Sequence, residues 1–428
     1  MNRWLLGCFL FVCAFVQVQA QSEIVINQGQ QSALGIAYVD FDVSAAGGEF
    51  AEFNRILERE LQLTHEFAPV RSAALLSTPT LGESIAWGDF KSKNLPFLLR
   101  GAIQLTASGQ QRYTYELWNV LTQEPLIKED YQSDHHVRRM AQTISDEIYE
   151  AILGIPGVAS TKILYVTSVK TASGFEFHLN IADSHGEFPQ PLVTSEKPIL
   201  SPTWSPDGSR FAYASYSQNK AVVFIQDLLT GVRQELPAFD GINGAPSWSP
   251  DGQYLAMTLS KDGNPEIYAY HIRSGTHQRL TVDSAIDTEP SWFPDGRGLL
   301  FTSDRGGSPQ LYRLDLASKK VTRLTFDGKY NAKGQVTPDG RYIVFVHGKS
   351  GQYHIAVKGV DRPLFKLLTQ TPLDESPSIS PNGLFIAYAT RNRGQNTLAF
   401  LALRNGKINY VPTQKAIREP AWSPFLNF

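Results

Sequence analysis

One proline-containing motif returns at a nearly constant interval, and this period constrains the fold more than any other feature of the chain. Its most complete copy is Glu289–Gly296, which reads E-P-S-W-F-P-D-G. The second proline of each copy marks its position: Pro206, Pro250, Pro294, Pro338, Pro381 and Pro424. Successive copies are 44, 44, 44, 43 and 43 residues apart. Such a fixed period indicates an architecture in which each repeat is one structural unit.

The Pro-Asp-Gly end of the motif suits a tight turn. Proline presets φ at about −65°, aspartate can bond the nearby backbone, and glycine accepts a positive φ. Strand-like runs follow each turn, for example Tyr254–Leu259 and Ile267–Tyr270, and a third run such as Gln278–Thr281 closes the repeat. With the Trp-bearing run before the turn, each period holds four short strands. This pattern predicts a β-propeller blade.

The two ends of the repeat region give the number of blades. The last copy stops at its turn, whereas residues 163–193 supply three strands with no Trp-bearing strand before them. We therefore expect the C-terminal strand at Trp422 to pair beside the strand at Ile163, which leaves no open sheet edge. This predicts a six-bladed propeller over residues 160–428. A β-solenoid or an open sandwich explains neither the four-strand period nor the split first copy.

The period is absent from residues 34–156, where helical and strand-like patterns are mixed. Apolar residues at helical spacing predict helices over Phe50–Leu63 and Val137–Ile152. Strands are expected at Ile36–Val43, Phe97–Ala107, Arg112–Trp118 and Glu124–Tyr131, the last two as a hairpin. The predicted fold is a two-domain α+β/all-β chain: a small N-terminal α/β domain followed by a six-bladed β-propeller closed by the C-terminal strand.

The first 20 residues have the pattern of a secretory signal peptide. Arg3 precedes an apolar core, and small side chains precede the expected cleavage site after Ala20. The apolar core is too short for a membrane anchor. Cys8 and Cys13 are the two cysteines of the chain, so the expected mature protein has no disulfide, thiol nucleophile or cysteine-bound metal. Residues 21–33 are expected to form a flexible partner-binding segment.

The motifs of common enzyme classes are missing. The sequence has no Gly-x-Ser-x-Gly elbow, no H-E-x-x-H and no D-x-D-x-D-G ladder, and the nine histidines share no repeat position. His135 and His136 fit an exposed helix cap better than a ligand pair. The net charge of −2 without a long basic run argues against nucleic acid as a partner. We predict a non-enzymatic binding protein with no catalytic residue, metal or cofactor. A secreted propeller enzyme or carbohydrate-binding protein is the alternative.

The residues just before each Pro-x-Trp are equivalent positions around the mouth of the predicted channel. They are Leu200 and Ser201; Asn243, Gly244 and Ala245; Asp287, Thr288 and Glu289; Ala332 and Lys333; Asp374 and Glu375; and Arg418 and Glu419. Their variation between copies fits a specialised face, but surface drift would produce the same variation. Five acids among them predict an acidic mouth and a ligand with positive or donor groups. The tryptophans are expected in blade packing: Trp204, Trp248, Trp292 and Trp422.

The whole chain resembles the TolB family of the Tol-Pal system of Gram-negative bacteria. The resemblance rests on the combination of the signal peptide, the α/β domain and the six motif copies that end at Trp422-Ser423-Pro424. Four stretches are similar to this family beyond propellers in general: Asn243–Pro246, Thr288–Pro294, Phe301–Asp304 and Glu419–Pro424.

The resemblance implies a periplasmic, non-enzymatic adaptor that maintains outer-membrane integrity and supports envelope constriction at cell division. Members of the family bind the Pal lipoprotein at the channel mouth and the C-terminal domain of TolA through the mature N-terminus. Other outer-membrane proteins and colicin translocation segments are further candidate partners, and the protein would reach membranes only through its partners.

The resemblance also implies site residues. The Pal-facing positions of the family correspond to Leu200, Ala245, Thr288 and Glu289, and repeat symmetry extends them to Glu375 and Glu419. Ile242 stands where the family often has a histidine. The TolA-binding segment corresponds to Gln21, Ser22, Glu23, Ile24, Val25, Ile26 and Asn27. Its alternating pattern suits addition to the sheet edge of a partner, while an edge strand of the first domain remains an alternative.

Overall fold

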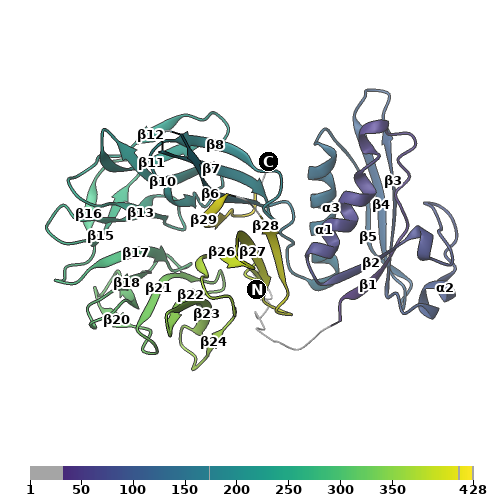
Figure 1. Ribbon diagram of the computed structural model, residues 1–428. Coiled ribbons are helices and arrows are strands. Elements are labelled where there is room, and N and C mark those ends of the chain that lie inside the picture. The colour runs from purple at the N-terminus through teal and green to yellow at the C-terminus, as the bar shows by residue number, and fades with distance from the viewer. Residues whose placement is uncertain (1–31, 173, 413–414, 427–428) are drawn as a thin grey trace, which may run out of the picture.

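The computed structural model describes residues 32–172, 174–412 and 415–426. It contains a five-stranded sheet with helices and, beside it, a ring of six four-stranded sheets (Figure 1). The predicted fold class is therefore confirmed. The expected signal peptide and residues 21–31 of the expected partner-binding segment lie outside the described residues.

The N-terminal sheet has the strand order β2-β1-β3-β4-β5. Its strands are β1 (Leu34–Tyr38), β2 (Phe67–Arg71), β3 (Phe97–Leu105), β4 (Gln111–Asn119) and β5 (Glu124–Ser133). Its helices are α1 (Phe53–Leu63), α2 (Trp87–Ser92) and α3 (Val137–Leu153), with short 3-10 turns η1 (Gly48–Phe50) and η2 (Ser72–Ala74). Strand β1 is parallel to β2 and β3, and β3, β4 and β5 are antiparallel. Helices α1 and α3 lie between this sheet and the propeller (Figure 1).

The two predicted long helices and the β4–β5 hairpin are confirmed. The strand expected at Ile36–Val43 instead ends at Tyr38. Just beyond the strand, the side-chain amide of Asn54 forms two hydrogen bonds with the backbone of Phe41. Phe41 N donates to Asn54 Oδ1 (2.8 Å), and Asn54 Nδ2 donates to Phe41 O (3.0 Å). These bonds tie Phe41 to the first turn of α1 and interrupt the strand, although Asp42 still forms a parallel bridge with Ala102 of β3.

The six sheets of the ring are numbered here as blades 1 to 6. Blade 1 contains β29 (Ala416–Trp422), β6 (Lys162–Thr171), β7 (Gly174–Asp183) and β8 (Gln190–Ser195). Blade 2 contains β9 (Leu200–Trp204), β10 (Arg210–Ser217), β11 (Lys220–Asp227) and β12 (Arg233–Glu235). Blade 3 contains β13 (Asn243–Trp248), β14 (Tyr254–Leu259), β15 (Glu266–His271) and β16 (His277–Arg279).

The remaining blades repeat this four-stranded order. Blade 4 contains β17 (Asp287–Trp292), β18 (Gly298–Ser303), β19 (Gln310–Asp315) and β20 (Val321–Arg323). Blade 5 contains β21 (Tyr330–Val336), β22 (Tyr342–Lys349), β23 (Gln352–Gly359) and β24 (Phe365–Leu367). Blade 6 contains β25 (Glu375–Ile379), β26 (Phe385–Asn392), β27 (Gln395–Ala402) and β28 (Ile408–Pro412).

The ring closes through blade 1, as the sequence predicts. Strand β29 pairs antiparallel with β6, and Trp422 lies opposite Ile163. The indole Nε1 of Trp422 donates to Thr161 Oγ1 (2.8 Å), and Lys162 N donates to Ser423 Oγ (3.0 Å). The C-terminal strand thus supplies the missing inner strand and pairs an edge that would otherwise be open.

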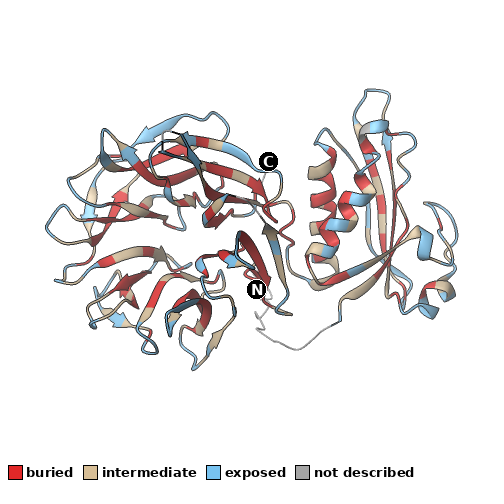
Figure 2. Ribbon diagram, viewed as in Figure 1, coloured by how far each residue is buried: buried red, intermediate tan, exposed pale blue. Residues whose placement is uncertain are grey.

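The tryptophans of the motif pack between blades. Trp204, Trp248 and Trp422 are buried, and buried residues follow the strands of every blade (Figure 2). Trp204 Nε1 donates to Ala421 O of blade 1 (3.0 Å), and Trp292 Nε1 donates to Ser247 O of blade 3 (3.1 Å). The predicted structural role of these tryptophans is confirmed by the burial of three of them, and for Trp204 and Trp292 the indole N–H also bonds a neighbouring blade.

The two domains share one continuous apolar cluster. It includes Leu61 of α1, Ile148 of α3 and Phe400 of β27. Polar contacts border it: Asn405 Nδ2 donates to His65 O (3.2 Å) and Asn409 Nδ2 donates to Leu63 O (3.3 Å). The α/β domain is therefore packed onto the outer strands of blade 6. Within the described ranges, no helix has both the length and the apolarity that crossing a membrane requires.

Candidate functional site

The channel mouth is formed by six residues that share an unusual backbone conformation, one from each blade. They are Ser201, Ala245, Glu289, Lys333, Ser376 and Glu419, with φ values of 49°, 48°, 54°, 51°, 53° and 51°. We call these six residues the mouth ring. Every innermost strand also shifts its register against the next strand at this point, which is a β-bulge. A bulge redirects the side chain it carries, and each of the six residues lines the channel.

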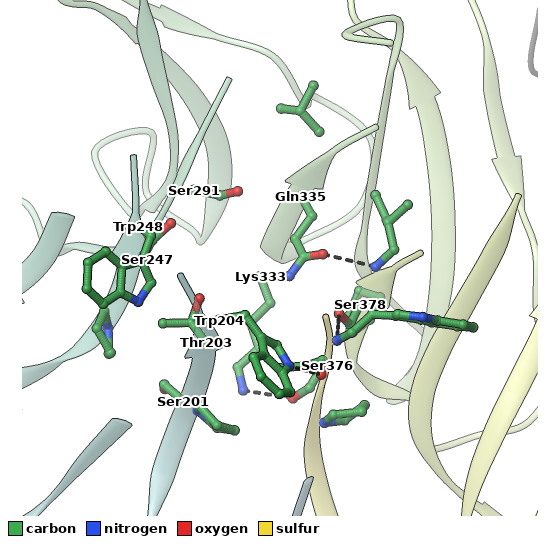
Figure 3. A pocket seen from close by; sticks show the side chains of 18 of the residues that line it. Ser201, Thr203, Trp204, Ser247, Trp248, Ser291, Lys333, Gln335, Ser376 and Ser378 are labelled. Carbon is green, nitrogen blue, oxygen red and sulfur yellow. Dashed lines mark hydrogen bonds between the residues drawn. The ribbon is translucent and has the colours of Figure 1, made fainter. Parts of the chain in front are cut away.

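The mouth ring contains a continuous set of polar contacts between blades. Glu289 Oε2 of blade 4 accepts a bond from Lys333 N of blade 5 (3.0 Å) and another from Thr302 Oγ1 (2.9 Å). Lys333 Nζ donates to Ser376 Oγ of blade 6 (2.9 Å; Figure 3). It also donates to Glu419 Oε1 of blade 1 (3.1 Å). Glu419 Oε2 in turn accepts a bond from Ser201 N of blade 2. The contacts therefore link five blades across the mouth.

Lys333 is the charged centre of this set. Burial by itself would lower the pKa of its ammonium group, but the facing carboxylates of Glu419 and Glu289 outweigh it and raise the pKa above its ordinary value. Lys333 is therefore protonated at neutral pH, and its ammonium group faces the carboxylates of the two glutamates. A partner at the mouth meets a hydrogen-bonded ring whose geometry is set before binding.

From the mouth ring inward, the channel is a cavity of about 510 Å³ lined by prolines and tryptophans together with polar side chains. Its next layer carries short hydroxyl and amide side chains: Thr203, Ser247, Ser291, Gln335 and Ser378 (Figure 3). Two of them join neighbouring blades, because Gln335 Oε1 accepts from Ile379 N (3.2 Å) and Ser378 Oγ accepts from Trp422 N (2.8 Å). The cavity is continuous with the mouth and contains no charged side chain in this layer.

A groove of about 580 Å³ leads from the mouth ring over blades 2 and 3. We call it the first groove. Five of the six residues predicted to face a protein partner line it: Leu200, Ala245, Thr288, Glu289 and Glu419. Ile242 also lines it and is 49% exposed, and Leu200 is 37% exposed. The groove thus combines exposed apolar surface with two oriented carboxylates, a combination suited to a protein interface.

The sixth predicted residue, Glu375, lies elsewhere on the mouth. It lines a separate groove of about 430 Å³ over blades 5, 6 and 1, which we call the second groove. Lys333 lines both grooves, so they meet at the mouth ring. Glu375, which repeat symmetry adds to the predicted set, thus lies apart from the other five residues.

The expectation of an openly acidic mouth is wrong. Asp287 and Asp374 are fully buried. Asp287 pairs with Arg305 (2.6 Å), and the carboxylate of Asp374 accepts bonds from three threonine hydroxyls. Burial raises the pKa of both carboxyls. Since Glu289 and Glu419 are also bonded within the mouth ring, Glu375 is the remaining exposed acid of the predicted five.

Some charged residues of the site were not given a role by sequence reasoning. Lys333 and Arg418 occupy recognised repeat positions, but the partners of Lys333, Ser376 and Glu419, come from other blades. Arg391 lies at the end of β26 and lines the second groove, outside the repeated motif that marks the mouth. No local pattern in the sequence connects Arg391 with Arg418.

The histidines stand apart from this site. His136 caps α3, with its ring accepting from Arg138 N (3.3 Å), as expected for a helix cap. In the part of the chain that the structure describes, no three His, Cys, Asp or Glu side chains gather closely enough to hold a metal ion.

Comparison with known proteins gives the same two parts. The TolB amino-terminal domain matches residues 22–126, and the TolB beta propeller domain matches residues 149–426. The Tol-Pal system protein TolB of Alcanivorax borkumensis is 45% identical over 99% of this chain and 98% of its own length. The protein of the same name from a Marinomonas species is 50% identical over 99% of this chain and 98% of its own.

A solved structure agrees with the sequence comparison. The crystal structure of TolB from Acinetobacter baumannii has a TM-score of 0.85 and 37% identity, and the match covers 93% of this chain and 98% of that one. The likeness therefore extends over both domains and not the propeller alone. The chain belongs to the TolB family of Tol-Pal system proteins.

Proposed function

We propose that this chain is a periplasmic, non-enzymatic adaptor of the Tol-Pal system that supports outer-membrane integrity and envelope constriction at division. It binds the Pal lipoprotein at the channel mouth and the C-terminal domain of TolA through Gln21–Asn27. The observation that supports the proposal most is the convergence of Leu200, Ala245, Thr288, Glu289 and Glu419 on the first groove. These residues come from four blades, so their convergence is a property of the fold.

Glu289 has the geometry of an anchor for a donor group of Pal. Its carboxylate is already oriented by Thr302 Oγ1 and Lys333 N, so binding need not fix a mobile side chain. Leu200 and Ile242 beside it offer exposed apolar surface, whose burial contributes about 25 cal/mol per Å². A buried hydrogen bond to a charged group surrounded by apolar contact is the usual composition of an interface hot spot.

Calorimetric titration of residues 21–428 with the soluble domain of cognate Pal tests this site. We expect saturable one-to-one binding, and Glu289→Ala should weaken it by about 1 to 3 kcal/mol. Glu235→Ala is the matched control, because Glu235 is exposed on the outermost strand of blade 2, away from the mouth. Unchanged affinity of Glu289→Ala would remove Glu289 from the site. Failure of the folded wild-type protein to bind Pal would overturn the adaptor proposal and reopen an enzymatic or carbohydrate-binding role.

The TolA-binding proposal has an independent test, since Gln21–Asn27 lies outside the described residues. The alternating apolar pattern of this segment suits strand addition to a partner's sheet edge. Deleting residues 21–27 should abolish binding to the TolA C-terminal domain and leave the affinity for Pal unchanged in the same titration. Persistent TolA binding by the shortened protein would move that site elsewhere on the chain.

A further inference from the structure

The second groove has a different character from the first. Arg391 and Arg418, one from the end of β26 and one from β29, both line it and are exposed. Neither guanidinium has an ion-pair partner among the described residues. Arg391 Nε donates to Gly394 O of its own hairpin (3.1 Å), which orients the side chain and leaves its other donors unused.

The acids that line this groove do not neutralise the arginines. Asp374 is fully buried, and its carboxylate is bonded by the hydroxyls of Thr369, Thr371 and Thr390. Lys333, which also lines the groove, is paired with Glu419 of the mouth ring. The exposed charged groups that line the groove are therefore one acid, Glu375, and two arginines, Arg391 and Arg418. Positive charge is in excess.

The wall that blade 5 and the segment after it contribute to the groove is apolar. Tyr330 and Tyr353 pack edge to face with their ring centres 5.2 Å apart, and Tyr353 and Leu373 are 38% and 48% exposed. Arginine presents a planar set of donors that matches a carboxylate, and an adjacent apolar wall favours burial of neighbouring side chains. Together the two walls suit an acidic peptide segment that also carries apolar side chains.

The second groove is connected to the first. Both include Lys333, so a protein seated on the mouth ring would extend over both grooves. We propose that the second groove binds an acidic segment of the same partner that occupies the first groove, with Arg391 and Arg418 pairing with its carboxylates. This inference rests on the proposed function, in which that partner is Pal.

Charge reversal tests the inference. Arg391→Glu and Arg418→Glu should each lower the affinity of residues 21–428 for the soluble domain of Pal by about tenfold, because attraction is replaced by repulsion. The affinity should also depend less on salt in each variant, since fewer opposite charges meet in the complex. Arg393→Glu is the matched control: Arg393 is exposed on the same hairpin and changes the net charge equally, but it does not line the groove.

The outcomes separate the two proposals. Circular dichroism and an unchanged thermal unfolding midpoint would establish that each variant is folded. If the wild-type protein binds Pal and both reversals leave affinity and salt dependence unchanged, the second groove is not part of the interface. Tighter binding of either variant would mean that the groove faces a basic segment, which also overturns the inference. Absence of Pal binding by the wild-type protein would instead refute the proposed function itself.

Discussion

Six side chains reach the channel mouth because their backbones adopt the left-handed conformation. For residues other than glycine this conformation costs about 1 to 2 kcal/mol, so a single occurrence would be a local liability. Here it occurs once in every blade, at a bulge, and five of the six residues are followed by proline. The repetition indicates that the ring imposes the conformation and that the blades' hydrogen bonds offset its cost.

Ala245 offers a direct test at this scale. Ala245→Val should lower the free energy of unfolding by about 1 to 2 kcal/mol, because a β-branched side chain is poorly accommodated at positive φ. Ala245→Ser should be close to neutral, since Ser201 and Ser376 hold the same position in two other blades. Urea unfolding followed by tryptophan fluorescence measures both. A Val variant as stable as the wild-type protein would show that the backbone of the mouth ring relaxes to accept the β-branched side chain.

The sequence located the mouth residues but not the state of their charges. Leu200, Ala245, Thr288 and Glu289 could be named because they precede a repeated motif. The burial of Asp287 could not, because its partner Arg305 follows a strand in the same blade and nothing in the repeat marks the pair. Whether a carboxylate faces solvent depends on donors that the fold brings to it.

At the scale of elements, the inner strands are fastened to their neighbours by the motif tryptophans. Trp204 and Trp248 occupy equivalent positions in blades 2 and 3 and are equally buried, at 6% exposure. Trp204 Nε1 donates to Ala421 O across the blade boundary, whereas Trp248 Nε1 has no hydrogen-bond partner among the described residues. Trp204 and Trp248 thus hold equivalent repeat positions, but only Trp204 adds a hydrogen bond between blades.

Phenylalanine substitution separates the hydrogen bond from the packing. Trp204→Phe should destabilise the protein by about 1 kcal/mol more than Trp248→Phe, because it leaves Ala421 O buried without its donor. The difference is reduced by the Arg210 guanidinium, which lies 5.0 Å from the Trp248 ring centre and loses part of that contact in Trp248→Phe. Thermal and urea unfolding of the two variants gives the comparison. Equal losses would mean that the Trp204 bond contributes nothing net.

The sequence predicted the blade strands and helices α1 and α3 but not strand β2 or helix α2, and the two groups differ in the strength of their patterns. The blade strands recur at regular intervals between repeated turns, and α1 and α3 have long amphipathic faces. Both kinds of pattern can therefore be recognised in the sequence. Strand β2 contains Pro69, which is tolerated because β2 is an edge strand. Helix α2 has 6 residues, too few for a helical period to be recognised.

At the scale of the whole molecule, the joint between the domains encloses titratable groups. Glu60 of α1 is 3% exposed, and its Oε2 lies 3.6 Å from His185 Nε2 of blade 1. Burial, assisted by Asp183, raises the pKa of Glu60 to about 8, and burial lowers the pKa of His185 to about 4. Both groups are thus uncharged at neutral pH. Asp183 pairs with Lys162 (2.7 Å) and Arg138 (3.6 Å).

This joint predicts a pH dependence of stability that Glu60→Gln should remove. Between pH 4.5 and about 8 the unfolded chain ionises Glu60 while the folded protein keeps it protonated. Over this window the wild-type protein therefore loses about 1.4 kcal/mol per pH unit from this group, and the loss levels off above pH 8. Glutamine resembles the protonated acid and does not titrate. The two proteins should be similarly stable near pH 4.5, with Glu60→Gln increasingly more stable toward pH 8.

The comparison isolates Glu60 because other groups titrate equally in both proteins. Depression of the pKa of His185 favours folding at higher pH, but this contribution is common to the wild-type protein and Glu60→Gln. Urea unfolding at a series of pH values gives the difference directly. Parallel stability profiles would show that Glu60 is ionised in the folded joint.

The sequence by itself determined the number of blades, the strand that closes the ring and the positions that surround the channel. These follow from short motifs repeated along the chain, because each copy forms the same local turn and strand arrangement. Only the tertiary structure decided that Lys333 joins Ser376 to Glu419, that Arg391 meets Arg418 in a second groove, and that Glu60 lies beside His185. Each of these depends on charged groups distant in sequence, whose burial and pairing exist only once the blades and domains have come together.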